Sequence, residues 1–282
     1  MKFFPLKIVS LIVVVTLLSS CGSKSAQIEP QIISKQFAKS GMQGSFMLFD
    51  EKHDAYLYHN RAQTDSLFSP GETFYLPLIL MGLHHQILAD EKTIFNWDSV
   101  IYPNQNWNIA QDVEHAFKNN TPWFFKKLIK GIGHARMLNG LIQFNYGNRD
   151  TTGGLDRFWK EEGLKISPKQ QIDFLRKLRN RKLDTKAISQ DILKRISVVT
   201  DSLGCLIHQS IGFSTQSGEN ITWLVGYMET PCNTFYFSTC LQSTSKTRSQ
   251  LNKVVKKITY NVINELRIMH LKKKDKLPEY KV

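Results

Sequence analysis

Hydrophobic and polar residues alternate in several short segments, and alternation with a period of two is typical of half-buried β-strands. Gly44–Asp50 and Ala55–Tyr58 are separated by a polar stretch and predict a hairpin. Near the other end of the chain, three further segments have the same character: Cys205–Phe213, Ile221–Met228 and Thr234–Leu241. The pattern therefore predicts strands in both terminal parts of the chain.

The middle of the chain has a different pattern, with apolar residues at the three- and four-residue spacing of helices. Phe74–Leu88 predicts an apolar helix entered through Pro70-Gly71, and Asp112–Ile132 predicts another. Ser167-Pro168 opens a further helix, since proline suits the first helical position. The last long segment predicts a helix with one apolar stripe, which comprises Leu251, Val254, Val255, Ile258, Val262, Ile263, Leu266 and Met269.

This order of elements predicts the fold class. Strands come first, then a mostly helical stretch, then strands and a terminal helix, so we expect the terminal strands to pair across the helical insert. The predicted class is α+β, with an antiparallel sheet flanked by helices and a mostly helical lobe.

The N-terminus carries the pattern of an exported protein. Lys2 and Lys7 precede the apolar segment Ile8–Leu18, which is short for a membrane span and typical of a signal peptide. Leu18-Ser-Ser-Cys21 resembles a bacterial lipobox, in which the cysteine becomes the acylated first residue. We therefore expect a signal peptide over residues 1–20 and a lipid anchor at Cys21. A plain signal anchor or an ordinary secretory signal is the alternative.

These features predict how the chain is divided and where it is located. A small, polar tether is expected over residues 21–40, the folded domain over 41–271, and a basic tail over 272–282. The expected location is the bacterial cell envelope, with a lipid anchor in a membrane. The sequence does not distinguish the inner membrane from the outer one.

Composition and charge limit the possible partners. The chain has 282 residues, 41% of them hydrophobic, so a sizeable core is expected. The formal net charge is +13, but the basic residues are spread along the chain and no nucleic-acid recognition motif accompanies them. Nucleic acid is therefore not an expected partner.

Cysteine and histidine residues give no clear cofactor or metal site. Cys205, Cys232 and Cys240 remain after Cys21, and an odd number cannot all pair within one chain. Cys232 and Cys240 are close enough in sequence for a bridge. His84 and His85 point to different faces of the predicted helix, so no shared metal and no cofactor are expected.

Several motifs, in order and at matching spacing over about residues 40–245, resemble the class D β-lactamases. These are Phe68-Ser-Pro-Gly-Glu-Thr-Phe-Tyr-Leu-Pro77, Trp97-Asp98, Trp107, Phe144-Asn-Tyr-Gly-Asn148, Phe158-Trp159, Gly163-Leu-Lys-Ile-Ser-Pro-Lys-Gln-Gln171, His208-Gln-Ser-Ile-Gly-Phe213 and Trp223-Leu-Val-Gly226. The resemblance implies the fold of the serine β-lactamases and penicillin-binding transpeptidases.

The resemblance also implies a mechanism. A serine hydroxyl needs a base within hydrogen-bond reach, and in these enzymes a lysine one helical turn later supplies it. In class D that lysine is carbamylated, and a tryptophan shields it. A second serine and a second lysine move protons and hold the substrate carboxylate, while two backbone N–H groups stabilise the oxyanion.

In this chain the catalytic positions of that mechanism hold other residues. Glu72 stands at the nucleophile position and Tyr75 at the position of the first lysine. Asn120 replaces the second serine, and Ser210-Ile211 replaces the second lysine and its threonine. No residue is therefore predicted to be catalytic in the family's manner.

The remaining motif residues predict a vestigial cleft. Tyr146, Asn148, Trp159, Gly212 and Phe213 match the family, and together with the replaced positions they form the candidate site. Each has a structural alternative, since Trp159 would also suit a core and Asn148 a loop cap. A misplaced alignment is a further alternative, but only Ser243 and Lys246 have the Ser-x-x-Lys spacing in this part of the chain, and they follow the last predicted strand.

Three functions are compatible with these residues. The first is a catalytically inactive β-lactamase-like envelope protein that binds a β-lactam, a peptidoglycan stem or a protein partner. The second is a hydrolase that uses Glu72 as a base. The third is a purely structural envelope protein. The first two predict an open polar pocket around residue 72, whereas the third predicts that Glu72 and Tyr75 are buried by other side chains.

Overall fold

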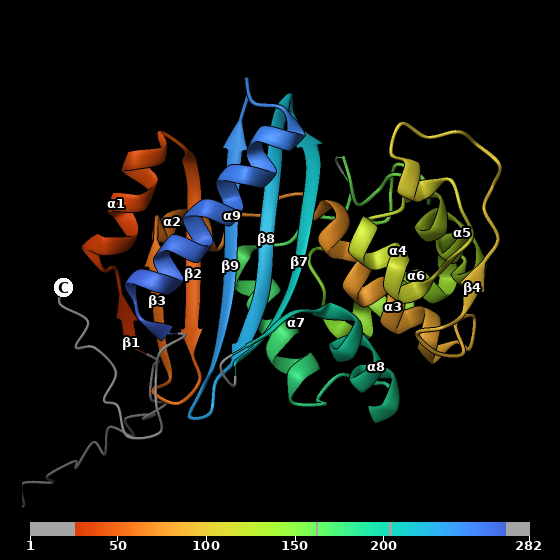
Figure 1. Ribbon diagram of the computed structural model, residues 1–282, viewed down its shortest axis with the longest axis horizontal. Coiled ribbons are helices and arrows are strands. Elements are labelled where there is room, and N and C mark those ends of the chain that lie inside the picture. Colours follow the sequence, from red (N-terminus) through yellow and green to blue (C-terminus); the bar gives the residue numbers. More distant parts are fainter. Residues whose placement is uncertain (1–25, 162, 203–204, 269–282) are drawn as a thin grey trace, which may run out of the picture.

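The computed structural model describes residues 26–161, 163–202 and 205–268 (Figure 1). Its main sheet has seven strands in the order β1-β3-β2-β9-β8-β7-β6. These strands are β1 (Ala26–Ile28), β2 (Gln43–Asp50), β3 (Ala55–His59), β6 (Val198–Ser202), β7 (Cys205–Gln216), β8 (Glu219–Glu229) and β9 (Thr234–Ser243). The strands at the two ends of the chain thus form one sheet, as the sequence predicts.

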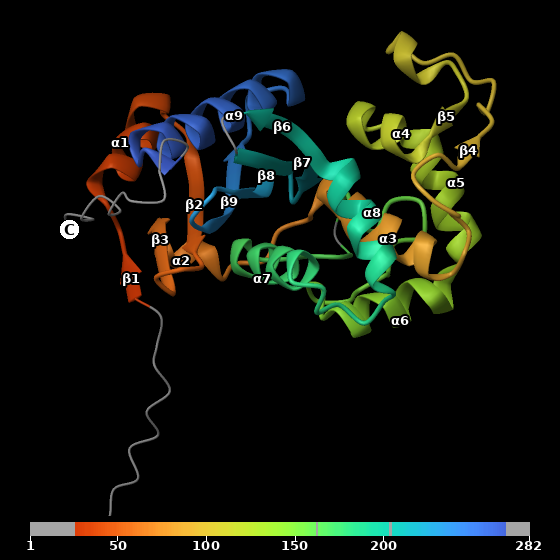
Figure 2. The same ribbon diagram turned by 60° about the horizontal axis from the view of Figure 1, so that its bottom comes forward.

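Helices cover both faces of this sheet (Figure 2). Helices α1 (Gln31–Ser40) and α9 (Arg248–Glu265) lie on one face, and α7 (Pro168–Arg179) lies on the other. The helical lobe adjoins the β6–β7 end. It contains α3 (Tyr75–His84), α4 (Val113–Asn119), α5 (Pro122–Ile132), α6 (His134–Phe144) and α8 (Ala187–Ser197), with the short α2 (Arg61–Thr64) near the first strands. The α+β class is therefore confirmed.

Alternation along the strands divides the core into two clusters. In β2, Phe46 and Leu48 belong to the cluster beneath α1 and α9, whereas Met47 and Phe49 belong to the cluster that continues into the helical lobe. Successive strand side chains point to opposite faces, so one strand contributes to both clusters. This explains why β2 is buried almost throughout.

The predicted tether over residues 21–40 needs a correction, because β1 and α1 lie within it. Strand β1 pairs with β3 in parallel, which makes the sheet mixed rather than wholly antiparallel. Ile33 and Phe37 of α1 are buried in the cluster beneath α9. The folded part therefore begins by residue 26. The predicted signal peptide, Cys21, Met269 and the basic tail lie outside the described residues.

The predicted helices differ in two places from the observed ones. The segment Asp112–Ile132 is two helices, because Asn120 adopts a left-handed conformation with a φ of 49° between α4 and α5. The predicted helix Phe74–Leu88 begins as the 3-10 turn η1 (Gly71–Phe74) and continues as α3 only to His84.

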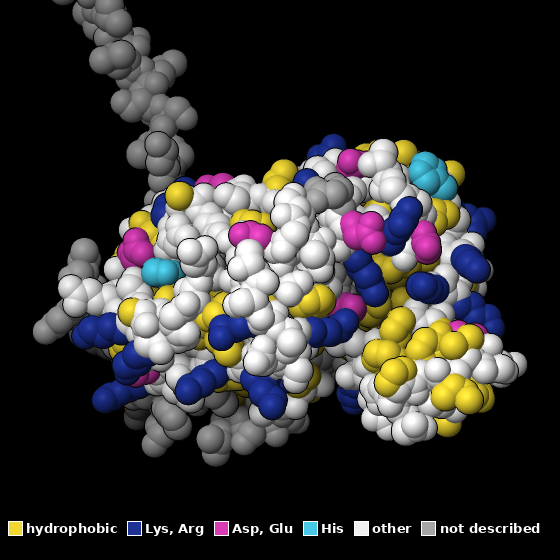
Figure 3. Space-filling model, turned by 90° about the horizontal axis from the view of Figure 1, so that it is seen from above, with side chains coloured by type: hydrophobic (Ala, Val, Ile, Leu, Met, Phe, Trp, Pro, Cys, Tyr) yellow, Lys and Arg dark blue, Asp and Glu magenta, His cyan; other side chains and the backbone are white. Residues whose placement is uncertain are grey.

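An arm over residues 90–112 joins α3 to α4. It contains β4 (Ile94–Phe95), η2 (Gln105–Trp107) and β5 (Gln111–Asp112). Its exposed apolar side chains gather on the lobe at the lower right of Figure 3, where Ile94, Val100, Ile101 and Ile109 are each more than half exposed. The described residues include no helix that is long and apolar enough to cross a membrane.

Candidate functional site

Residue 72 lies where the 3-10 turn η1 meets strand β7. Gly71 has a φ of 55°, and a Cβ atom there would lie 2.4 Å from the Phe213 carbonyl oxygen. A Cβ atom on Gly212 would lie 2.5 Å from the Pro70 carbonyl oxygen. Two glycines that face each other thus permit the backbones to approach this closely. The approach brings Glu72 against the backbone of Phe213.

The Glu72 carboxylate is buried and surrounded by donors. Its side chain is only 2% exposed. The Phe213 backbone N–H donates to Oε2 at 2.8 Å, and Arg248 Nη1 donates to Oε1 at 3.2 Å. Lys160 Nζ lies 3.6 Å from Oε1. Both carboxylate oxygens therefore have partners, as a buried charge requires.

Sequence reasoning identified Glu72 and Phe213 but missed Arg248 and Lys160. Arg248 begins α9 and Lys160 follows Trp159, so both lie far from residue 72 along the chain. Their side chains are partly exposed, at 41% and 29%, and they reach the carboxylate from outside. Lys160 directly follows the Phe158-Trp159 motif, but nothing local in the sequence indicated that it pairs with Glu72.

Tyr75 is packed as a core residue. It is 1% exposed, and its ring stacks on Phe125 of α5 with a centroid distance of 3.6 Å and an interplanar angle of 12°. Burial, and then the charge of Glu72, raise the pKa of the Tyr75 hydroxyl well above its usual value. Tyr75 therefore stays protonated at neutral pH and has the wrong properties for a general base.

The corner around Asn120 is fixed by its neighbours. Asn120 ends α4 in the left-handed conformation that asparagine tolerates, and Pro122 takes the first position of α5. Thr121 between them is buried and donates from Oγ1 to Gln111 Oε1 at 2.7 Å. The structure thus gives these residues a role in joining two helices.

Ser210 lies in β7, two residues before Gly212. Its side chain is buried, and its Oγ has no hydrogen-bond partner within the described part of the chain. Ser210 pairs in register with Val225 of β8. The position at which the resemblance implies a second lysine is therefore a buried strand position that holds an uncharged serine.

Asn148 and Tyr146, from the Phe144–Asn148 motif, form a scaffold next to η1. Asn148 Nδ2 donates to the Gly163 carbonyl at 3.0 Å, and Asn148 Oδ1 accepts from the Lys165 backbone N–H at 2.9 Å. The buried hydroxyl of Tyr146 donates to Gln171 Oε1 at 3.4 Å, and burial raises its pKa.

Trp159 belongs to the same scaffold. It is 1% exposed, and its ring packs on Phe74 with centroids 6.0 Å apart. Its carbonyl accepts from the Gly71 backbone N–H at 2.9 Å, which ties this segment to the turn before Glu72. The indole Nε1 is buried and lacks a hydrogen-bond partner among the residues described here.

Neither Ser69, three residues before Glu72, nor Ser243 of the Ser-x-x-Lys spacing resembles a nucleophile. Ser69 is fully buried, and its hydroxyl donates to the Glu161 carbonyl. Ser243 Oγ accepts from the Lys246 backbone N–H at 3.1 Å and closes a turn after β9. The Ser-x-x-Lys spacing at residues 243–246 is thus explained by turn structure.

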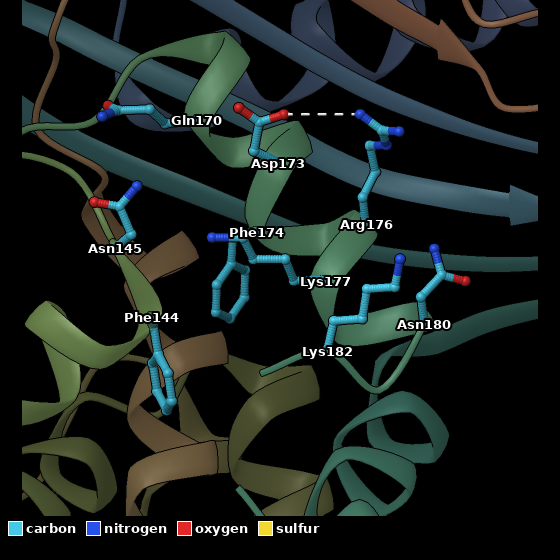
Figure 4. A pocket seen from close by; sticks show the side chains of 9 residues that line it. All are labelled: Phe144, Asn145, Gln170, Asp173, Phe174, Arg176, Lys177, Asn180 and Lys182. Carbon is cyan, nitrogen blue, oxygen red and sulfur yellow. Dashed lines mark ion pairs between the residues drawn. The ribbon is translucent and has the colours of Figure 1, made fainter. Parts of the chain in front are cut away.

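A separate hollow of about 250 Å³ lies between the end of α6 and helix α7 (Figure 4). Asp173 in this hollow contacts Lys169 at 3.0 Å and Arg176 at 4.0 Å. Glu72 and Tyr75 do not line it. Within the described ranges, no group of three or more His, Cys, Asp or Glu side chains is arranged to hold a metal ion.

Comparisons with known proteins identify the family and the fold. Residues 36–197 match the penicillin binding protein transpeptidase domain. Beta-lactamase OXA-48 of Klebsiella pneumoniae is 32% identical over 202 residues, which cover 72% of this chain and 76% of that enzyme. A class D β-lactamase structure from Sebaldella termitidis has a TM-score of 0.83 and 28% identity, with 86% of this chain and 99% of that chain covered.

A regulatory protein is also similar. Regulatory protein BlaR1 of Bacillus licheniformis is 31% identical over 76% of this chain, which spans only 36% of the length of that relative. The structure of the C-terminal domain of the Bacillus licheniformis BlaR penicillin-receptor has a TM-score of 0.79 and 27% identity, with 85% of this chain and 96% of that chain covered.

The chain belongs to the penicillin-binding protein transpeptidase family, and its fold is that of the class D β-lactamases. Relatives of this fold include both hydrolases and a receptor domain. Fold alone therefore does not assign an activity, and the site must do so.

Proposed function

We propose that this protein is a member of the transpeptidase family that does not form an acyl-enzyme, and that it acts at the bacterial envelope by binding. The supporting observation is the Glu72 carboxylate, which takes the nucleophile position and is held by Arg248, Lys160 and the Phe213 N–H. A site that already holds a carboxylate suits a ligand with a carboxylate. β-Lactams and peptidoglycan stems both carry one.

A hydrolase that uses Glu72 as its base is less well supported. A general base must reach a substrate proton or a water molecule. Both Glu72 oxygens have cationic or N–H partners, and the side chain is 2% exposed. The nearby Tyr75 has a raised pKa and cannot act as a second base.

Glu72 and Tyr75 are themselves buried, as the purely structural reading predicts. Binding therefore requires that a ligand carboxylate displaces Glu72 from its partners. Arg248 and Lys160 are partly exposed, so a ligand can reach them from solvent. The similarity to a receptor domain described by its penicillin ligand supports this proposal over the structural one.

Calorimetric titration with benzylpenicillin and with a D-Ala-D-Ala stem peptide tests the proposal. Wild-type protein should bind weakly, because Glu72 competes with the ligand. Glu72→Gln keeps the side-chain size and removes this competition, so the Kd should fall about tenfold. Glu161→Gln is a matched control, since Glu161 is exposed and close in space to the turn before Glu72.

If neither ligand binds to wild type or Glu72→Gln, the cleft has no carboxylate ligand of this class, and the structural reading stands.

Anchoring at the envelope is part of the same proposal. The pattern before Cys21 supports lipid attachment there, and each buried methylene of an acyl chain contributes about 0.8 kcal/mol to membrane binding. Fatty-acid labelling of cells should mark the wild-type protein and be lost in Cys21→Ala. Equal labelling of both would exclude Cys21 as the anchor.

A protein partner is the second candidate, favoured by the apolar arm. Clustered exposed apolar side chains often mark interaction sites, and Ile101 of the arm is 82% exposed. If the arm binds a partner, Ile101→Asp should weaken cross-linking to that partner and leave ligand binding by Glu72→Gln unchanged.

A further inference from the structure

Cys205 and Cys232 lie at the same end of the main sheet. Strand β7 begins at Cys205, and Leu206 pairs with Glu229 of β8 in antiparallel register. Continued by one residue, this register places Cys205 opposite Thr230. Thr230 Oγ1 lies 3.6 Å from Cys232 Sγ. Residues directly opposite each other have Cβ atoms about 5 Å apart, so Cys205 lies beside Thr230, whose hydroxyl contacts the Cys232 sulfur.

Both cysteines also face the same side of the sheet. Ile207 of β7 and Met228 of β8 belong to the cluster beneath α9. Because strand side chains alternate, Cys205 and Thr230 share that face with them. Cys232 packs against the same cluster. The two cysteines therefore lie on one face of the sheet, at the same end of β7 and β8.

Cys240 is separated from this pair. It lies within β9 opposite Trp223, fully buried in the cluster on the other face. The bridge between Cys232 and Cys240 that their sequence spacing allows is therefore absent, and Cys240 is a free cysteine. Burial raises the pKa of its thiol well above the usual value, which makes it unreactive.

We infer that Cys205 and Cys232 are a redox pair that forms a disulfide when the protein meets a disulfide-bearing oxidant. Cys232 is the more accessible of the two, since Cys205 is only 2% exposed. Burial, and then the nearby Cys232, raise the pKa of the Cys205 thiol. Cys232 is thus the thiol that reacts first.

The chemistry is thiol–disulfide exchange in two steps. The Cys232 thiolate attacks one sulfur of the oxidant, the oxidant's S–S bond breaks, and one oxidant thiol leaves. The Cys205 thiolate then attacks the Cys232 sulfur in the mixed disulfide and expels the second oxidant thiol. The two cysteines lose two protons and two electrons, and the oxidant takes up both electrons as it becomes two thiols.

The bridge would join the start of β7 to the turn between β8 and β9. Strand β7 carries Ser210, Gly212 and Phe213, so the disulfide would fix one end of the strand that supports Glu72. A disulfide that closes a loop reduces the conformational entropy of the unfolded chain, so the melting temperature should rise on oxidation.

Peptide mapping of the full-length protein tests the inference directly. The protein is incubated with oxidised glutathione, denatured, alkylated with iodoacetamide and digested without reduction. The expected product is a linked peptide that contains Cys205 and Cys232, with a mass about 2 Da below the sum of the two reduced peptides. Cys240 should be fully alkylated in the same sample.

Two variants sharpen the test. Cys240→Ala should leave the linked peptide unchanged, whereas Cys232→Ser lies in a partly exposed turn and should abolish it without loss of fold. Alkylation of both Cys205 and Cys232 after oxidation, or a linked peptide that contains Cys240 or Cys21 instead, would overturn the inference. The wild-type map decides this even if a variant fails to fold.

Discussion

Glu72 and Tyr75, at the positions predicted to have lost catalytic residues, differ from Tyr146 and Asn148, which match the family motif, in the contacts they make. Asn148 bonds to the backbone of residues 163 and 165, and Tyr146 to Gln171, so both hold neighbouring segments together. Glu72 and Tyr75 instead have partners of their own, in Arg248 and Phe125.

This comparison indicates what each position contributes. Residues that connect segments are needed for folding, whatever the chemistry of the site. A residue that does not connect segments can also stabilise the fold when its side chain pairs or packs well. Glu72 and Tyr75 should therefore contribute more to the stability of this protein than residues of a catalytic centre usually do.

The largest expected effect is at Tyr75. Tyr75→Ala removes a fully buried ring stacked on Phe125, and loss of a large aromatic side chain from a core costs about 3–5 kcal/mol. Urea denaturation measures this change. Tyr75→Phe keeps the ring and should stay within about 1.5 kcal/mol of wild type. A small effect of Tyr75→Ala would show that the position is not a packed core site.

Glu72→Ala should destabilise the protein less than Tyr75→Ala. The change removes the carboxylate and leaves the Phe213 N–H without its acceptor, which costs about 1–3 kcal/mol. Arg248 and Lys160 are partly exposed and can turn to water, so their contribution to the loss is limited. Urea denaturation again measures the change, and a more stable Glu72→Ala protein would mean that Glu72 is strained rather than stabilising.

At the scaffold, Asn148→Ala should cost about 1–2 kcal/mol, because two hydrogen bonds to backbone groups are lost. Gln143→Ala is the matched control, since Gln143 is exposed on α6. An effect of Asn148→Ala equal to that of the control would contradict the scaffold role.

Acid stability probes a separate contact, at Glu229, the last residue of β8. His208, 3.7 Å away, and the Arg179 guanidinium hold the pKa of the Glu229 carboxyl at about 2 against the opposing effect of burial. A lowered pKa in the folded state gives stability that is present above pH 4.5 and is lost as pH falls toward 2. The free energy of unfolding of Glu229→Gln should therefore change less over this pH range than that of the wild type.

Much of the fold was predictable because it depends on local patterns. Strands β2, β7, β8 and β9 lie where alternation predicted them, and Ser167 begins α7 with the expected proline and a capping box. The boundary of the tether was wrong. Ile33 and Phe37 gain their burial from α9, more than two hundred residues away, and no local pattern reveals this.

The site was predictable only in part, because contacts between distant segments leave no local pattern in the sequence. Motif order placed Glu72, Tyr75 and Phe213 together. The partners Arg248, Lys160 and Phe125 depend on how distant elements meet, and each looks ordinary in its own sequence context. The sequence predicted other residues at the family's catalytic positions, whereas the contacts of Glu72 and Tyr75 became visible only in the folded chain.

The central claim is that this site forms no acyl-enzyme, and intact mass spectrometry after incubation with benzylpenicillin tests it most directly. The account predicts an unchanged mass for wild type and also for Glu72→Ser, because Tyr75 supplies no base and residues 120 and 210 supply no proton shuttle or lysine. A stable penicilloyl adduct on the wild-type protein would contradict the account. An adduct on Glu72→Ser alone would show that the rest of the catalytic centre is still functional.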